Sequence, residues 1–440
     1  MPSFKQSTLR KELGFWDSIA ISVGIAIGVG IFRVPSEIAA IMPYPQLIIT
    51  AWLVGGLLCL FGALCYAELS STFPETGGDY VYIRENYGLL PAFLYGWASI
   101  FIIRTGIIAA VAFVFSEYLC SLTCLCKGFI KPVAISTIVS LSLINGIGVR
   151  IGKNLLNLSV MTKVIALVVL IICALSSSKG STENLHVGLD KSAFEIVNMF
   201  ALALVPVLWT YGGWHESTFM TGETKDAQKV LPIALITATL IITGIYVLLN
   251  VSYLYLIPVQ SVKELPLIAG EVMKLIFGKW AKKGIEFLIV ISSFGTLNAT
   301  IMTSSRITYA MSKDNPFFKY LSRISTRFGT PFRALVLNAV LASILVAWGT
   351  FNKLLFFTGL LVWLFFGVIV SAVIVSRIKY PELKRPFKAW GYPFTPVVFA
   401  CVCFWMCVDI FFRYKLQSIC GLGIMISGIV VYKISMSLKI

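Results

Sequence analysis

Residues 25–35 read IAIGVGIFRVP, an apolar run that is interrupted by Gly28 and Gly30 and then by Arg33 and Pro35. Such a run is typical of a membrane-spanning helix, but the interruptions weaken it in the middle. In hydrocarbon every backbone N–H and C=O group must find a partner, so a break is tolerated only where protein or a water-filled cavity receives the freed groups. The stretch therefore predicts a broken membrane helix with a binding site at the break.

Apolar stretches of membrane-spanning length recur along the 440 residues, of which 58% are hydrophobic and only 13% are charged. A membrane helix needs about 20 predominantly apolar residues. The pattern predicts an all-α membrane protein that forms one domain over residues 1–440. We expect about twelve spans, with approximate limits at 15–41, 47–73, 90–120, 132–147, 154–176, 193–221, 231–256, 284–311, 333–350, 354–376, 394–414 and 418–438.

The net charge of +16 comes mainly from Lys and Arg in short connections between the apolar spans. In a membrane protein such charge normally records orientation, and its bias predicts a multi-pass plasma (inner) membrane protein with both termini cytoplasmic. The same placement argues against nucleic-acid binding. The connection 263–283 is an exception, because it is rich in Lys on the other side, but its apolar spacing predicts a helix on the membrane surface.

A second interrupted span contains the sequence VLWTYGGWHES, in which Gly212 and Gly213 break an otherwise apolar run. This span is the sixth, and the first broken span is its counterpart if the chain contains two five-helix repeats. Paired Gly-interrupted helices in inverted repeats point to the midplane binding site of a secondary transporter. We expect repeats at about 15–176 and 193–376, followed by additional helices at 394–438.

The two breaks offer backbone groups of opposite polarity. The N–H groups of Gly28, Val29 and Gly30 begin the second half of the first broken helix, at the positive end of its dipole, and suit a carboxylate. Freed carbonyl oxygens suit an ammonium group. Those expected here belong to Ala26, Trp209 and Gly212. Together these groups fit an α-amino acid, whereas the alternative is ordinary helix packing, in which small residues are also common.

Four basic residues fall inside predicted spans, where a charge costs about 2.5 to 3.5 kcal/mol on insertion scales and needs a partner or water. Lys163 is the clearest case, because its ammonium is placed to donate to the freed carbonyls of the first broken helix, where a sodium ion would otherwise bind. The alternative is a side chain that snorkels to the cytoplasmic surface. Arg104 and Arg306 are interpreted as structural ion-pair or carbonyl-binding residues. Arg33 fits either the inner cavity or the external path.

His215 and Glu216 follow the second break and are candidates for carrying a proton, since His titrates near neutral pH. The alternative is a polar pair that lines the pathway without titrating. Trp209 is a candidate lid over bound substrate, although Trp is also common as an interface anchor. The sequence contains no HExxH, Gly-x-Ser-x-Gly or Walker motif, so neither an enzyme nor an ATP-driven pump is expected. We expect no cofactor and no metal site.

Six segments carry a family resemblance, and they read LRKELGFWDSIAISVGIAIGVGIF at 9–32, YAELSSTFPETGGDYVYIRENYG at 66–88, YGGWHESTFMTGETKDAQKVLP at 211–232, FGTLNATIMTSSRITYAMSKD at 294–314, RFGTPFRA at 327–334 and YPELKRPFKAWGYPFTP at 380–396. Through them the chain resembles the amino acid, polyamine and organocation (APC) transporter superfamily. Within that superfamily it is most similar to the L-type amino acid transporters and their bacterial relatives.

The resemblance implies a LeuT-type fold, a five-plus-five inverted repeat with helices 1 and 6 broken. It places the carboxylate site on Gly28, Val29 and Gly30, and Val29 replaces the usual Ser, so a side-chain hydroxyl contact is lost. The aromatic gate falls on Trp209, and Lys163 stands where sodium binds in sodium-coupled relatives. The amine-binding carbonyls fall on Ala26, Trp209 and Gly212.

From the residues and the resemblance we hypothesise a sodium-independent secondary active transporter of amino acids that works by alternating access as an exchanger. Neutral substrates are favoured, because no cluster of acids is expected in the pocket. The alternatives are a proton-coupled amino acid or polyamine symporter and, from another class, an amino acid-gated channel or receptor. The connection at about 121–131 is short, which argues against the disulfide-linked glycoprotein partner of animal relatives, so no obligatory heavy-chain partner is expected.

Overall fold

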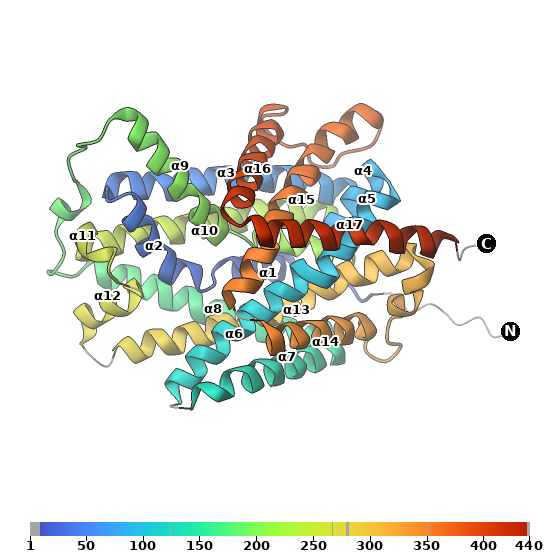
Figure 1. The fold of residues 1–440 in the computed structure, drawn as a ribbon, viewed down its shortest axis with the longest axis horizontal. Helices are drawn as coiled ribbons and strands as arrows, with labels where there is room; N and C mark the ends of the chain where they lie inside the picture. Colours follow the sequence, from blue (N-terminus) through green and yellow to red (C-terminus); the bar gives the residue numbers. More distant parts are fainter. Residues whose placement is uncertain (1–8, 124, 266, 279–280, 350, 438–440) are drawn as a thin grey trace.

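The computed structural model describes residues 9–123, 125–265, 267–278, 281–349 and 351–437, without the side chains of 127, 282 and 351–357. Within these ranges the chain is a bundle of helices (Figure 1). The helices of the first half are α1 (Phe15–Ala26), α2 (Gly30–Ile41), α3 (Pro45–Thr72), α4 (Asp79–Tyr87), α5 (Leu89–Ala98), α6 (Arg104–Leu122), α7 (Ile130–Ile147) and α8 (Val149–Leu175).

The helices of the second half are α9 (Ala193–Thr210), α10 (Ala227–Leu256), α11 (Val259–Val262), α12 (Ile268–Phe277), α13 (Ala281–Asp314), α14 (Phe332–Trp348), α15 (Phe351–Lys379), α16 (Phe394–Arg413) and α17 (Lys415–Ser437). A π-helical segment, η1 (Ser99–Ile103), joins α5 to α6. The 3-10 helices are η2 (Lys127–Phe129), η3 (Thr182–Leu185), η4 (Glu216–Glu223) and η5 (Pro316–Ser322).

The described helices agree with the predicted spans. Ten continuous helices are long and apolar enough to cross a membrane, and α1 with α2 forms an eleventh span that is bent by 44°. The remaining predicted span is α14, whose 17 residues stand at the lower limit of about 17 for crossing hydrocarbon. The all-α membrane fold is thereby confirmed. Most helix ends differ from the prediction by a few residues, but the span predicted at 193–221 ends as an α-helix at Thr210 and continues after the break as the 3-10 helix η4. The helix expected in the connection 263–283 is α12, which buries Ile268 and Val272.

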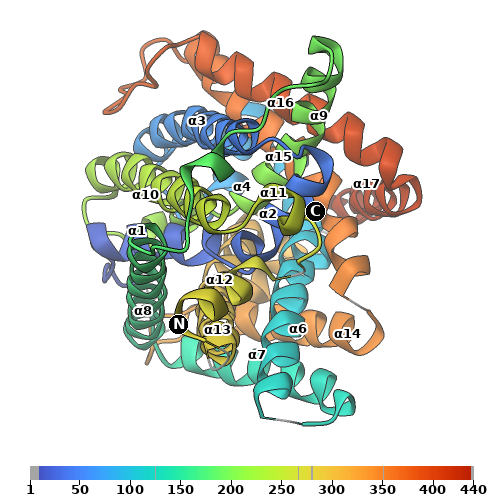
Figure 2. The ribbon, with the colours of Figure 1, turned by 90° about the vertical axis from the view of Figure 1, so that its left-hand side faces the viewer.

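Most long helices follow the long axis of the molecule, and the first and last described parts of the chain lie at the same end of it (Figure 1). We call this end the terminal side and the other end the far side. Seen along this axis, α16 and α17 lie at the edge of the bundle (Figure 2). Their membrane-length windows are also mostly unburied. The most buried windows belong to the span that contains α5 and α6 and to α13, so the core lies around these helices.

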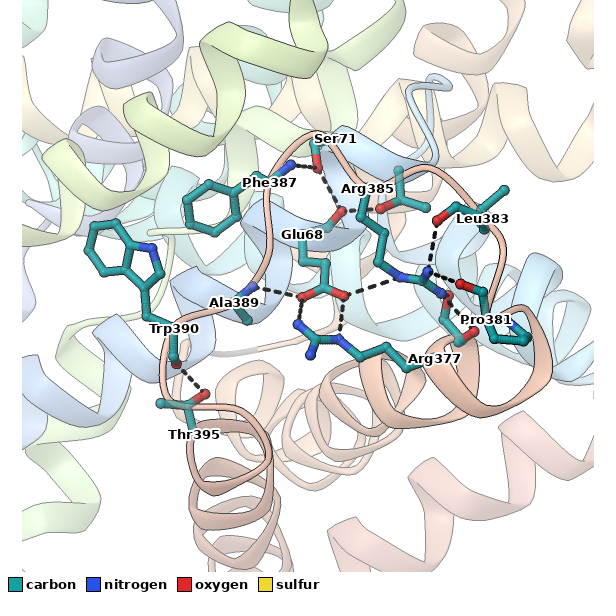
Figure 3. A network of polar contacts seen from close by, with 12 residues as sticks. Glu68, Ser71, Arg377, Pro381, Leu383, Arg385, Phe387, Ala389, Trp390 and Thr395 are labelled. Atoms are coloured by element: carbon teal, nitrogen blue, oxygen red, sulfur yellow. Dashed lines mark hydrogen bonds and ion pairs between the residues drawn. The ribbon is translucent and has the colours of Figure 1, made fainter.

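A buried acid, Glu68, fastens the connection between α15 and α16 to the terminal-side end of α3 (Figure 3). Arg377 donates to both carboxylate oxygens at 2.9 and 2.6 Å. The backbone N–H of Ala389 donates to Oε2 at 2.7 Å, and Arg385 pairs with Oε1 at 3.5 Å. One carboxylate therefore binds a guanidinium group from the end of α15 and a guanidinium group and a backbone amide from the connection that follows it.

Replacing Glu68 by Gln should lower the free energy of unfolding by about 3 kcal/mol, because breaking a buried ion pair leaves an uncompensated charge. The matched control is Asp409→Asn, which removes a pair with Arg413, a side chain that is 47% exposed. This change should cost less than about 1 kcal/mol. The unfolding midpoints of the purified proteins measure both effects, and equal midpoints for the two variants would contradict the role given to Glu68.

Candidate functional site

The first break separates α1 from α2 over three residues, Ile27, Gly28 and Val29. In the described part of the chain, the backbone N–H groups of Val29 and Gly30 donate no hydrogen bond. The Gly28 N–H differs from the expectation, because it turns back and donates to the Ala26 carbonyl at 2.8 Å. The N–H groups available at the start of α2 are therefore those of Val29 and Gly30.

The second break lies between α9, which ends at Thr210, and η4. Gly213 has φ of +116°, and a Cβ atom there would lie 2.7 Å from the Ala26 backbone nitrogen. Glycine is therefore required on both counts, since it adopts this φ freely and lets the two breaks touch. The Tyr246 hydroxyl joins them further, because it lies 2.6 Å from the Ala26 carbonyl oxygen and 3.1 Å from that of Thr210.

The expected acceptors for an ammonium group are only partly free. The Ala26 carbonyl receives the Gly28 N–H and the Tyr246 hydroxyl. The Trp209 carbonyl receives the Gly212 N–H at 3.0 Å, whereas the Gly212 carbonyl accepts no hydrogen bond from any described residue. The Tyr211 N–H also points to the Trp209 carbonyl. A carbonyl oxygen has two lone pairs, so Gly212 keeps both acceptor positions, whereas the Trp209 carbonyl is already engaged by two backbone N–H groups.

Lys163 is fully buried in α8 and does not extend to the membrane surface. Its ammonium donates to the carbonyls of Gly24 at 2.6 Å and Ile27 at 2.8 Å. Two hydroxyls from α13 complete the cluster, because Thr296 donates to Gly24 and Ser292 donates to Ile27. The carbonyls freed at the end of α1 are thus bound by one cation and two hydroxyls.

A cavity of about 220 Å³ lies at the two breaks. It brings together eight of the nine residues that the sequence singled out for the site, and these are Ala26, Gly28, Val29, Gly30, Trp209, Gly212, His215 and Glu216. Lys163 does not line it and instead binds the end of α1 beside it. Towards the far side the cavity follows α6 and α15 past Val111, Val114 and Thr358.

Charged residues form the terminal-side end of the cavity. Arg104 begins α6 directly after η1, and its guanidinium pairs with the Glu216 carboxylate. Asp79 begins α4 and receives a hydrogen bond from the Tyr95 hydroxyl at 3.0 Å. His215 lies 4.0 Å from Glu216. All five residues line the cavity and are buried.

The acid at position 79 corrects one expectation, because the sequence analysis found no cluster of acids in the pocket. Asp79 and Tyr95 were missed. Asp79 follows Gly77 and Gly78 in a connection at the terminal side, and both glycines have positive φ. These turns carry the chain back into the bundle, which spacing along the sequence could not reveal. The quoted GGDY motif was the available signal.

Two other basic residues lie outside the cavity. Arg306 is fully buried in α13 and binds both oxygens of Glu223 at 2.8 and 2.9 Å. This pairing agrees with its structural interpretation. Arg33 is 60% exposed on α2, pairs with Glu37 at 3.3 Å and does not line the cavity.

On the terminal side, the segment that precedes α1 contacts the end of η4 and the residues that follow it. Leu13 donates its N–H to the Glu223 carbonyl at 2.9 Å and accepts the Lys225 N–H at 2.9 Å. Lys153 on α8 binds the Asp17 carboxylate of α1 at 2.9 Å. These contacts hold the start of α1 against the residues that follow η4.

Residues 13–432 match the amino acid permease family. The human b(0,+)-type amino acid transporter 1 is 31% identical over 396 residues, which cover 87% of this chain and 80% of that protein. The serine/threonine exchanger SteT of Bacillus subtilis (strain 168) is 30% identical over 429 residues, or 96% of each chain. The human large neutral amino acids transporter small subunit 2 is 29% identical over 440 residues, covering 96% of this chain and 80% of that protein.

The family match extends from just before α1 into α17, so it includes both broken helices and the cavity. Together with the membrane-length helices it confirms the resemblance to the APC superfamily, whose members are transporters. The chain is a multi-pass membrane protein that belongs to the amino acid permease family.

Proposed function

We propose that the chain exchanges amino acids across the membrane by alternating access. The observation that carries this proposal is a single cavity lined by Val29 and Gly30, whose backbone N–H groups are free, and by Gly212, whose carbonyl is free among the described residues. An α-carboxylate binds the start of α2, where the helix dipole is positive, and an α-ammonium binds the end of α9. The name of the Bacillus relative, a serine/threonine exchanger, supports exchange as the mode.

Inverted repeats are supported by which helices pack together. Under the expected division, α3 corresponds to α10 and α1 to α9, and the pairs α1 with α10 and α3 with α9 are both in contact. The pairs α6 with α7 and α13 with α14 correspond in the same way and are also in contact. We assign the repeats to about 15–176 and 193–376, with α16 and α17 as additional helices.

Sodium independence follows from the cluster around Lys163. Sodium binds oxygen ligands, and the carbonyls of Gly24 and Ile27 with the hydroxyls of Ser292 and Thr296 form such a set. The Lys163 ammonium already occupies the position between the two carbonyls. A fixed cation therefore supplies the positive charge at the end of α1, and no sodium ion is required there.

The cavity extends to the far side, while Leu13 and Lys153 make contacts that close the terminal side. With both termini cytoplasmic, this arrangement is an outward-facing state of the plasma membrane protein. Trp209 is 40% exposed at the cavity wall, and we assign it as the lid that covers bound substrate. Arg33 then lies on the external side.

Proton coupling is the rival mode, and one observation favours it. His215 and Glu216 lie 4.0 Å apart in the cavity wall, so they are placed to carry a proton while substrate is bound. Proton coupling would be identified if a pH gradient drives net uptake of amino acid into liposomes that contain no internal amino acid.

Counterflow with the purified chain alone tests the function. Unlabelled amino acid inside liposomes should accelerate uptake of labelled amino acid, because a carrier returns faster when loaded, whereas a channel shows no such acceleration. The single chain should suffice, since the connection from α6 to α7 is short. Cys120 is buried, so the exposed Cys126 is the cysteine in the described part of this connection that a partner could reach. Activity only with an added partner protein would contradict the proposal that no obligatory heavy chain is needed.

Replacing Gly28 by Val should abolish amino acid binding without unfolding the protein. A Cβ atom at Gly28 meets nothing closer than 3.7 Å, whereas one at Gly30 would lie 2.9 Å from Thr210, so Gly28 is the cleaner site. The added side chain obstructs the carboxylate position. Gly244→Val is the control, because Gly244 lies on α10 with open space around its Cβ position. Unchanged affinity in a thermal-shift titration of Gly28→Val would refute the site.

Replacing sodium by choline should leave the counterflow rate of the unmodified protein unchanged. Lys163→Ala should slow exchange by about tenfold or more, because a charge-assisted hydrogen bond contributes about 1.5 to 3 kcal/mol and two carbonyls lose such a donor. The control is Lys274→Ala on α12, whose side chain is 48% exposed. Sodium-dependent counterflow in the unmodified protein would contradict the proposal that the Lys163 ammonium takes the place of a sodium ion.

A further inference from the structure

The charged end of the cavity holds polar atoms that no described residue satisfies. Oε2 of Glu216, Oδ1 of Asp79 and Nδ1 of His215 make no hydrogen bond within the described ranges. Glu216 and Asp79 are each only 3% exposed, and His215 is 6% exposed. A buried polar group without a partner costs about 1 to 3 kcal/mol. The Tyr66 hydroxyl lies near Asp79 and the Thr303 hydroxyl near Glu216, but neither makes a hydrogen bond of normal geometry to these atoms. Three such atoms in residues that line one cavity favour a polar ligand group at this end.

The charge at this end is formally negative. Asp79 and Glu216 contribute two carboxylates, and Arg104 is the only Lys or Arg among the described residues that line the cavity. The Arg104 guanidinium is already engaged, because it pairs with Glu216 and lies 4.3 Å from the centroid of the Phe219 ring. One carboxylate therefore remains without a matching cation.

Aromatic rings line the same end. Phe366 of α15 lies 4.8 Å from the His215 ring and 5.6 Å from the Trp363 ring, measured between centroids. Both α15 rings line the cavity. Aromatic faces attract cations, more strongly when water is excluded. The rings and the carboxylate excess therefore favour the same kind of ligand group by independent physical effects.

We infer that this end of the cavity is a side-chain subsite, where the Asp79 and Glu216 carboxylates bind a cationic, hydrogen-bond-donating side chain of the transported amino acid and exclude a carboxylate. This inference rests on the proposed function, because the α-carboxylate and α-ammonium are held at the helix breaks. It replaces the expectation of neutral substrates, which depended on a pocket without clustered acids. The side chain points to the terminal side, towards Asp79 and Tyr95.

Matched amino acids test the subsite in the unmodified protein. Lysine and norleucine differ only in the terminal ammonium, and glutamine and glutamate differ in the terminal charge. In counterflow inhibition with purified protein in liposomes, lysine should bind at least about tenfold more tightly than norleucine, which corresponds to 1.4 kcal/mol. Glutamate should not compete at concentrations where glutamine does. Equal affinities within either pair would overturn the inference.

Two variants test the residues. Asp79→Asn and Glu216→Gln should each bring the ratio of lysine to norleucine affinity towards one. The ratio is measured on a single preparation, so a smaller folded fraction does not change it. Asp409→Asn on α16 is the acid-to-amide control outside the cavity and should keep the original ratio. An unchanged ratio in both cavity variants would overturn the assignment.

The outcomes separate this inference from the proposed function. If norleucine is exchanged and lysine is not, the subsite is wrong while the proposed function stands. If none of the amino acids is exchanged, the proposed function itself fails. Cadaverine, which is lysine without its α-carboxylate, completes the set. Exchange of cadaverine as readily as lysine would identify a diamine carrier and refute both the carboxylate site and the inference.

Discussion

A backbone group released inside hydrocarbon must be bound by something, and this requirement organises the centre of the molecule. Where α1 ends, the carbonyls of Gly24 and Ile27 receive the Lys163 ammonium, and two α13 hydroxyls bind the same oxygens. Where α9 ends, the Tyr246 hydroxyl binds Thr210 and reaches across to Ala26. Val29, Gly30 and Gly212, whose backbone groups remain free, line the cavity, so the proposed binding site consists of backbone positions that the described residues do not satisfy.

The same requirement explains where the buried charges lie. An unpaired Arg306 would be costly inside α13, but its guanidinium donates two hydrogen bonds to the Glu223 carboxylate. Glu223 ends η4, and its carbonyl also receives the Leu13 N–H. The end of η4, the second part of the broken span, is therefore bound both to α13 and to the segment before α1. Buried pairs of this kind position elements, because leaving either partner alone would be expensive.

Much of the fold could be predicted from the sequence, because apolar length and interrupting glycines are local signals. Lys163 and the two glycine pairs stand inside apolar runs, where any departure is conspicuous. Asp79 could not be identified in this way, since it lies in a polar connection and enters the cavity only through the turns at Gly77 and Gly78. The hydrogen bond from the Gly28 N–H to the Ala26 carbonyl could not be predicted either, because it depends on the backbone path of the three residues between α1 and α2.

The contacts between the breaks limit how the site can open to the terminal side. Gly213 lies against Ala26 with no room for a Cβ atom, and Tyr246 binds both half-helix ends, so these parts move as one unit. That unit meets α8 through Lys163 and Lys153, and the Lys153 contact with Asp17 closes the terminal side. Under the proposed function, a substrate that bridges the free N–H groups of α2 and the free carbonyl of Gly212 binds this unit without contacting Lys153. Transport therefore requires that closure on the far side weakens the terminal-side contacts, because a ligand shifts a conformational equilibrium only through interactions that differ between the two states.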